Sequence, residues 1–402
     1  MNRTPLHLFS IVAIVAVLCM ACGDDDSDAA DNQIDPEPSE NQEDPTNQED
    51  PANQEDPANQ EDPEEPGCEV VFFDDDGEPF ETLAEYCFFD GPLAETNPAE
   101  GVIPYEVTAE LYSDRSSKER FLVLPPGEYI GFDADEPWDW PDKTILIKTF
   151  YYPVDKRDPD AGRRILETRL LHKQEGEWNA DSYVWDDDQE QAQRHNFGQR
   201  VEVSFKDDAG DNVEIDYRIP NRNQCSTCHG QDGDLEPLGP RTRQLLKPHS
   251  KTPEGPAQIE FLAEHDLFDA SIPSTEELFG VVDPHDENAP LDDRARSYLD
   301  ANCAHCHNPD GRASTSNLHL QIDEDNLRRI GICKTPVAAG TAAGGRPYDI
   351  VPGEPDESIL VYRMETTNSE HKMPELPITT VDKFGVELVR QWISAMEPPG
   401  CP

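Results

Sequence analysis

The sequence predicts a multidomain protein in which an N-terminal all-β, sandwich-like domain precedes a mainly α region. Two changes of pattern along the chain support this prediction. Residues 68–220 contain short runs that alternate polar and apolar residues, as half-buried strands do. After residue 220, apolar residues recur at steps of three and four, which is the spacing of amphipathic helices. The 402 residues leave room for two or three compact domains.

The chain opens with an export signal. An apolar run over residues 8–20 is too short and too close to the terminus to be a convincing membrane span. Ala21 followed by Cys22 is typical of a bacterial lipoprotein signal, so we expect residues 1–22 to be such a signal and Cys22 to carry the lipid. The protein would then be exported and lipid-anchored, in the periplasm or at the outer membrane. Cys19 stands where lipoprotein signals usually carry Leu, so an ordinary cleaved signal is the alternative.

Residues 23–67 are predicted to form a disordered acidic spacer. From residue 41 the chain repeats six-residue units such as NQEDPT and NQEDPA, which have no apolar side chain larger than Ala. Uniform negative charge and regular prolines keep such a segment extended and solvated. We expect it to hold the folded part away from the membrane surface.

The formal net charge of −53 is extreme, with 85 acidic against 32 basic residues. Such a charge argues against nucleic-acid binding and favours partners with basic patches. A generally acidic proteome would explain it equally well.

The β-rich domain is predicted to span residues 68–220. Its strand-like runs are separated by Gly, Asp and Pro, and we expect them to form an antiparallel sandwich. The runs are ERFLVLP, KTILIKTFYYPV, RRILETRLLHK, RVEVSFKD and VEIDYRIP. Four tryptophans in this part supply bulky side chains for a core or for an exposed rim.

Two C-x-x-C-H motifs carry the chemistry. Their residues are Cys225, Cys228 and His229 in the first motif, and Cys303, Cys306 and His307 in the second. This spacing lets both thiols add to the vinyl groups of one haem while the adjacent His reaches the iron. A single shared zinc would make the two histidines superfluous, and a thioredoxin-type pair would need a βαβ context that this sequence lacks. Two covalently bound haem c groups are therefore expected.

The second motif lies in a predicted domain over residues 291–402. The preceding LDDRARSYLDAN has helical spacing, and the region resembles a small cytochrome c domain, in which an amphipathic helix leads into the haem motif. That resemblance points to Met373, in EHKMPELP, as the second iron ligand, ahead of a last helix from Val381 to Met396. His371 is the competitor.

The first motif lies in a predicted haem region over residues 221–290. It follows a strand-like run, and no Met occurs between the two motifs. The following EPLGPRTRQLL contains a Leu-Gly-Pro turn similar to one that packs against the haem edge in c-type cytochromes. An open iron is one option for this haem, and the candidate sixth ligands are His195, His249, His265 and His285.

Several segments together resemble a bacterial family of exported dihaem c-type cytochromes. They include IPNRNQCSTCHG, YLDANCAHCHNPDG, YDIVPGEPDESILVYRM and the upstream GVIPYEVTAELYSDRSSKERFLVLPPG. The resemblance implies cytochrome c-type haem domains after the β domain, and iron ligation by His229, His307 and Met373. It covers nearly everything after the spacer.

Four further cysteines fit neither motif, and exported proteins use such residues as disulfides. Order along the chain pairs Cys68 with Cys87 and Cys333 with Cys401, although four cysteines allow three connectivities.

Electron transfer between redox partner proteins at the cell envelope is the leading hypothesis for function. A dihaem peroxidase with an open iron at the first motif is the alternative, but its motifs are generally further apart than the 78 positions between Cys225 and Cys303. A lipoprotein whose β domain binds a carbohydrate or a partner is a third class.

Overall fold

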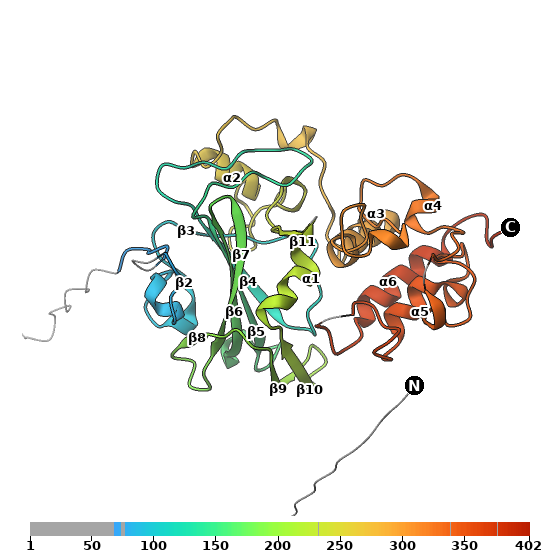
Figure 1. The fold of residues 1–402 in the computed structure, drawn as a ribbon, viewed down its shortest axis with the longest axis horizontal. Coiled ribbons are helices and arrows are strands. Elements are labelled where there is room, and N and C mark those ends of the chain that lie inside the picture. Colours follow the sequence, from blue (N-terminus) through green and yellow to red (C-terminus); the bar gives the residue numbers. More distant parts are fainter. Residues whose placement is uncertain (1–67, 74–76, 232, 338, 376) are drawn as a thin grey trace, which may run out of the picture. The chain divides into compact units, whose positions relative to one another are not determined.

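An antiparallel sheet of six strands is the largest element of the structure (Figure 1). The computed structural model describes residues 68–73, 77–231, 233–337, 339–375 and 377–402. The predicted signal with its Cys22 and the predicted spacer lie outside these residues. Among the helices of the described ranges, none is long and apolar enough to cross a membrane.

The strands of this sheet follow one another in chain order, so each pairs with its sequence neighbour. They are β3 (Val102–Pro104), β4 (Ser117–Val123), β5 (Ile145–Pro153), β6 (Arg163–Gln174), β7 (Glu177–Trp185) and β8 (Ala192–Arg194). Such a meander needs only local connections. The expected strand-like runs around residues 145, 163 and 200 all form strands, which confirms this part of the prediction.

Both faces of the sheet are buried. On β5, Ile145 and Ile147 pack into one core, whereas Leu146 packs into another, because neighbouring side chains of a strand point to opposite faces. The first core is completed by the N-terminal segment around Tyr86, and the second by the segment that contains α2 (Gln258–Glu264). Segments with little regular structure therefore cover the sheet where a sandwich would place a second sheet.

Three short strand pairs complete the β structure of the described ranges. A hairpin of β9 (Gln199–Lys206) and β10 (Asn212–Ile219) packs its apolar side against Tyr152 of β5. The other two pairs are β1 (Phe89–Asp90) with β2 (Asn97–Pro98), and β11 (Gly230–Gln231) with β12 (Asp234–Leu235).

The described helices are short, between 4 and 12 residues. Besides α2 they are α1 (Cys225–His229), α3 (Leu291–Leu299), α4 (Leu327–Ile330), α5 (Ile359–Glu365) and α6 (Lys383–Ser394). The spacing of apolar residues predicted the last helix to within two residues at each end. Between these helices the chain runs through turns and short 3₁₀ segments.

The predicted fold class, a sandwich-like all-β domain followed by a mainly α cytochrome c-type region, is wrong. The structure is mostly β-sheet, and its few short helices do not make up a mainly α domain. Apolar steps of three and four occur in segments that stop after one to three turns, because Pro, Gly and polar loops end them. The boundaries drawn at residues 68–220, 221–290 and 291–402 stay predictions.

The C-terminal helices share a core in which α3 packs on α6. Trp392 donates from Nε1 to Asp292, and Tyr298 donates to Asp382, the residue that caps the start of α6. The approach is so close that a Cβ at Gly385 would collide with the ring and hydroxyl of Tyr298. Any side chain at residue 385 would therefore force Tyr298 to move.

Two disulfides join the cysteines that fit neither motif. Cys68 pairs with Cys87 in the N-terminal segment, and Cys333 pairs with Cys401 beside the last helix. The pairing expected from chain order is confirmed.

Asp114 joins the segment before β4 to the segment before α6. Its buried carboxylate accepts hydrogen bonds from the backbone N–H and the hydroxyl of both Thr379 and Thr380. Nearby, the hydroxyl of Tyr112 shares a 2.8 Å hydrogen bond with that of Thr380. A charged acceptor with several donors is a strong contact, and it fixes where the chain runs between residues 373 and 380.

We expect Asp114→Ala to lower the free energy of unfolding by roughly 3 kcal/mol, because it leaves buried backbone N–H groups without partners. Ala would also be disfavoured at the positive φ of 49° that Asp114 adopts. Asp114→Asn keeps an acceptor and should cost less. Denaturant titration of the three proteins measures the difference, and equal stabilities would contradict the role given to Asp114.

Candidate functional site

The two C-x-x-C-H motifs lie directly against each other. The Sγ atom of Cys306 is 3.4 Å from the backbone oxygen of Thr227, in the middle of the first motif. Gln231 donates from its side-chain amide to the backbone oxygen of His305, and Arg312 donates to the hydroxyl of Thr227. Nothing in the sequence indicated this contact, because the motifs are 78 positions apart.

The first motif is the whole of helix α1. β10 ends at Ile219, and Asn221 and Gln224 then satisfy each other's backbone N–H groups in a capping box. The helix begins at Cys225, so Cys225 and Cys228 are three residues apart on one turn and face the same side. The strand-like run expected before this motif is confirmed.

The second motif follows helix α3 through a wider turn over Asp300–Ala304. Asn302 holds this turn in place: it accepts from the backbone N–H of Tyr112 and donates to the backbone oxygens of Glu110 and Tyr298. The thiols of Cys303 and Cys306 are thereby positioned relative to the segment that precedes β4.

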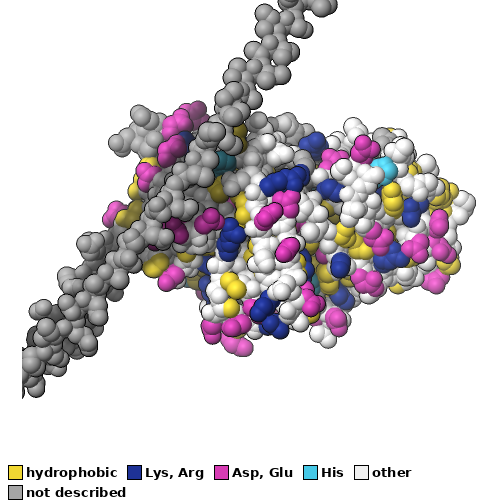
Figure 2. All heavy atoms as spheres, turned by 90° about the horizontal axis from the view of Figure 1, so that it is seen from below, with side chains coloured by type: hydrophobic (Ala, Val, Ile, Leu, Met, Phe, Trp, Pro, Cys, Tyr) yellow, Lys and Arg dark blue, Asp and Glu magenta, His cyan; other side chains and the backbone are white. Residues whose placement is uncertain are grey.

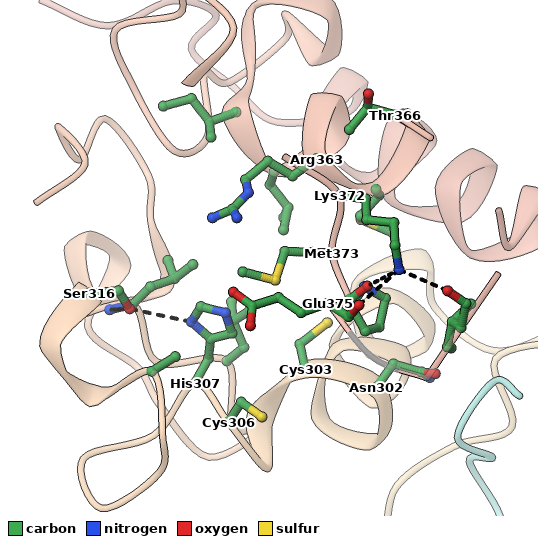
Figure 3. A pocket seen from close by; sticks show the side chains of 18 of the residues that line it. Asn302, Cys303, Cys306, His307, Ser316, Arg363, Thr366, Lys372, Met373 and Glu375 are labelled. Atoms are coloured by element: carbon green, nitrogen blue, oxygen red, sulfur yellow. Dashed lines mark hydrogen bonds between the residues drawn. The ribbon is translucent and has the colours of Figure 1, made fainter. Parts of the chain in front are cut away.

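A cavity of about 360 Å³, the second-motif cavity, opens at the second motif. Cys303, Cys306 and His307 line it on one side and Met373 on another, and Figure 3 shows the side chains of Met373 and His307 pointing into the same space. Ligand sites in proteins occupy about 300–1,000 Å³, so this cavity is of the size that holds a cofactor.

His307 presents one ring nitrogen to this cavity. Its Nδ1 shares a hydrogen bond of 3.3 Å with the hydroxyl of Ser316. Burial, with smaller effects from nearby cations, lowers the pKa of His307 to about 4, so the ring is neutral at pH 7. A neutral imidazole with its Nδ1 held by a neighbour can offer Nε2 to a metal.

Met373 is held in a fixed loop. Its backbone N–H donates to the backbone oxygen of Arg363, and Lys372 donates to the backbone oxygens of Pro374, Glu375 and Ile378. His371 does not line the second-motif cavity, because its Nδ1 is hydrogen-bonded to the hydroxyl of Tyr362 at 2.9 Å. Arg363 and Glu375 also point into the cavity (Figure 3).

A smaller cavity of about 170 Å³, the first-motif cavity, is lined by Cys225, Cys228 and His229. The Nδ1 atom of His229 is 2.7 Å from the backbone oxygen of Glu236. Because a carbonyl only accepts, Nδ1 carries the proton, which leaves the lone pair on Nε2. Burial lowers the pKa of His229 to about 4, so the ring is neutral. Leu238 and Gly239 of the expected Leu-Gly-Pro turn also line this cavity.

Cationic side chains from the sheet form the floor of the first-motif cavity. Lys148, Arg120 and Arg169 line it. Burial and the neighbouring cations lower the pKa of Lys148 well below its usual value. Arg169 is paired with Glu167, a fully buried carboxylate that also accepts from Tyr217 and Ser182. Arg120 is paired in the same way with Glu110, and the carboxylates of Asp114 and Asp181 also line the cavity, so charged groups of both signs lie beside its apolar walls.

The four motif cysteines are the free cysteines of the described chain. Burial raises the pKa of Cys303 to about 12 and that of Cys306 to about 11, and it also raises the pKa of Cys225 and Cys228. A thioredoxin-type cysteine has a lowered pKa instead. The thiols here are protonated at pH 7, which disfavours thiolate redox chemistry.

The histidines expected as sixth ligands at the first motif do not line its cavity. The Nε2 of His249 lies 3.8 Å from a carboxylate oxygen of Glu106, His265 and His285 pack on Phe261 and Phe384, and His195 packs edge-on against Phe197. His305, inside the second motif, lines both cavities. Sequence reasoning missed it, although the spelling C-A-H-C-H shows a second histidine.

Comparisons with known proteins found no match. No protein-family model matches this chain, and no curated protein or solved structure does. In the described ranges no three His, Cys, Asp or Glu side chains are grouped so as to hold one metal ion. The geometry of the two cavities is therefore the basis for any proposal about function.

We expect Glu167→Gln to lower the free energy of unfolding by roughly 3–5 kcal/mol, because it leaves the charge of Arg169 without its buried counterion. Glu202→Gln, at an exposed position on β9, is the matched control and should change stability little. Denaturant titration measures both. If the free energy of unfolding falls no more in the Glu167 variant than in the control, the ion pair of Glu167 with Arg169 does not stabilise the fold as we expect.

Proposed function

We propose that this protein is a dihaem c-type cytochrome that transfers electrons at the bacterial cell envelope. The observation that carries the proposal is the pair of C-x-x-C-H motifs in direct contact, each lining a cavity of its own. Two haems bound in this way would be neighbours, as an electron relay requires. Export, and lipid attachment at Cys22, are parts of the same proposal that rest on the sequence.

The residues present fit a covalently bound haem. In each motif two thiols line a cavity, and a neutral histidine offers Nε2 while a neighbouring oxygen holds its Nδ1. A bound haem would supply one-electron chemistry, and the chain would supply attachment, iron ligation and an apolar surround. The first-motif cavity is smaller than usual ligand sites, so side chains there would shift to admit a haem.

Met373 is proposed as the residue that would bind the iron of the second haem together with His307. Both side chains point into the second-motif cavity, and hydrogen bonds hold the Met373 backbone and the neighbouring Lys372. His371 is turned to Tyr362 instead. A thioether opposite an imidazole raises the reduction potential relative to two imidazoles.

The third class of function receives less support than electron transfer. Trp138, Trp140 and Trp185 are buried in the cores of the sheet, so they do not form an exposed binding rim. Partner proteins with basic patches stay part of the proposal because of the net charge. On the face drawn in Figure 2, acidic and basic side chains are interspersed.

We expect the full chain, produced with a c-type maturation system, to carry two haems, measured as the haem-to-protein ratio and by mass. Cys225→Ser with Cys228→Ser should leave one haem, and so should Cys303→Ser with Cys306→Ser. Cys68→Ser with Cys87→Ser removes a disulfide and is the control that should keep two. One haem or none in the unaltered chain would refute the proposal, and peroxide turnover with a high-spin signal would favour the peroxidase.

We expect Met373→Ala to abolish the methionine-to-iron charge-transfer band. Axial ligands set haem reduction potentials over a range of about 0.8 V. The substitution should lower the midpoint potential of the haem at the second motif by roughly a tenth of that range. His371→Ala, two residues away, is the matched control and should keep both properties. Loss of the band in the control, or its persistence in the Met373 variant, would reverse the assignment.

A further inference from the structure

His305 belongs to the second motif but also lines the cavity of the first. It is the third residue of C-A-H-C-H, and Thr227 is the third residue of C-S-T-C-H. Each of these two residues lines the cavity of the other motif as well as that of its own. Cys228 of the first motif lines both cavities as well, so the contact between the motifs forms part of both cavities.

The backbone geometry explains this exchange. Successive residues of a helical turn are about 100° apart, so the third residue of the motif points away from the two thiols. The second motif is pressed against the first by the contact of Cys306 with Thr227 and by the hydrogen bond from Gln231 to the backbone of His305. His305 therefore lies on the side of its turn that faces away from Cys303 and Cys306, and this side lines the first-motif cavity.

The Nδ1 atom of His305 has no hydrogen-bond partner in the described part of the chain. It is buried, whereas His229 and His307 both have a partner at Nδ1. Buried ring nitrogens in native proteins are nearly always paired, so an exception needs a partner such as a water molecule or a metal ion. The Nδ1 atom of His305 is therefore available to a ligand, and His305 lines both cavities.

Other donors at this cavity are less suitable. No methionine is among the residues that line it in the described ranges. Lys148 is the main competitor, but its Nζ lies over the ring of Phe150 at 5.1 Å, next to Arg120 and Arg169. The Nζ atom of Lys148 is thus held at the face of an aromatic ring, whereas the Nδ1 atom of His305 has no partner in the described part of the chain.

We propose that His305 would be the second iron ligand of a haem at the first motif, together with His229. The inference rests on the proposed function, because it needs a haem at Cys225 and Cys228. One turn of the second motif would then hold one haem through Cys306 and the other through His305. The first haem would be held by two imidazoles and the second by an imidazole and a thioether, so the second would have the higher reduction potential.

The test starts with the full, haem-loaded chain. Near-infrared magnetic circular dichroism and electron paramagnetic resonance should show one haem with two nitrogen ligands and one with nitrogen and sulfur, both low-spin. His305→Ala should turn one of the two low-spin signals high-spin, and added imidazole should restore it. His305→Met should keep that haem low-spin and raise its midpoint potential. His371→Ala is the matched control and should change neither signal.

The outcomes separate the inference from the proposed function. Fewer than two haems in the unaltered chain would end the proposed function itself. Two haems with both low-spin signals intact in His305→Ala would overturn the inference alone. So would a high-spin signal that appears in Lys148→Ala and not in His305→Ala. If His305→Ala does not bind both haems, two other measurements still test the inference. They are the midpoint potential of His305→Met, which should rise, and the ligand bands of the unaltered chain, which should show one haem with two nitrogen ligands.

Discussion

Direct contact between the two C-x-x-C-H segments is the constraint on which the rest of the site depends. The 3.4 Å approach of Cys306 to Thr227 fixes which sides of the two motifs face each other. It follows that the two cavities share a wall made of the motifs themselves. In the proposed cytochrome, the residues of this wall would attach both haems and lie between them.

The antiparallel sheet supports this contact from one side. Its strand β5 contributes Lys148 to the floor of the first-motif cavity, and β6 contributes Arg169. The hairpin that ends at Ile219 leads into α1, whereas Asn302 and Asp114 tie the C-terminal elements to the segment before β4. The β structure is thus part of the site, and not a separate module that precedes it.

Local features were predictable from the sequence because they depend on neighbouring residues. The motifs, the helix at Lys383–Ser394, the strand at Ile145–Pro153 and both disulfides follow from spacing, alternation or chain order. The fold class was not predictable in the same way. Alternation shows that Leu146 faces away from its neighbours Ile145 and Ile147, but it does not show whether a second sheet or an irregular segment covers each side. The place of His305 depends on a contact between segments 78 positions apart, which no local pattern reveals.

The two disulfides have a consequence for the order in which the chain matures. Their loops span residues 68–87 and 333–401, so neither encloses a motif cysteine. If the chain is exported from its N-terminus, as proposed, Cys68 and Cys87 would emerge together and could pair before any motif thiol is present. Cys401 would emerge after all the others, so the second disulfide could close once both motifs are outside. In the proposed cytochrome, the order of the eight cysteines in the sequence would thus keep disulfide formation apart from haem attachment.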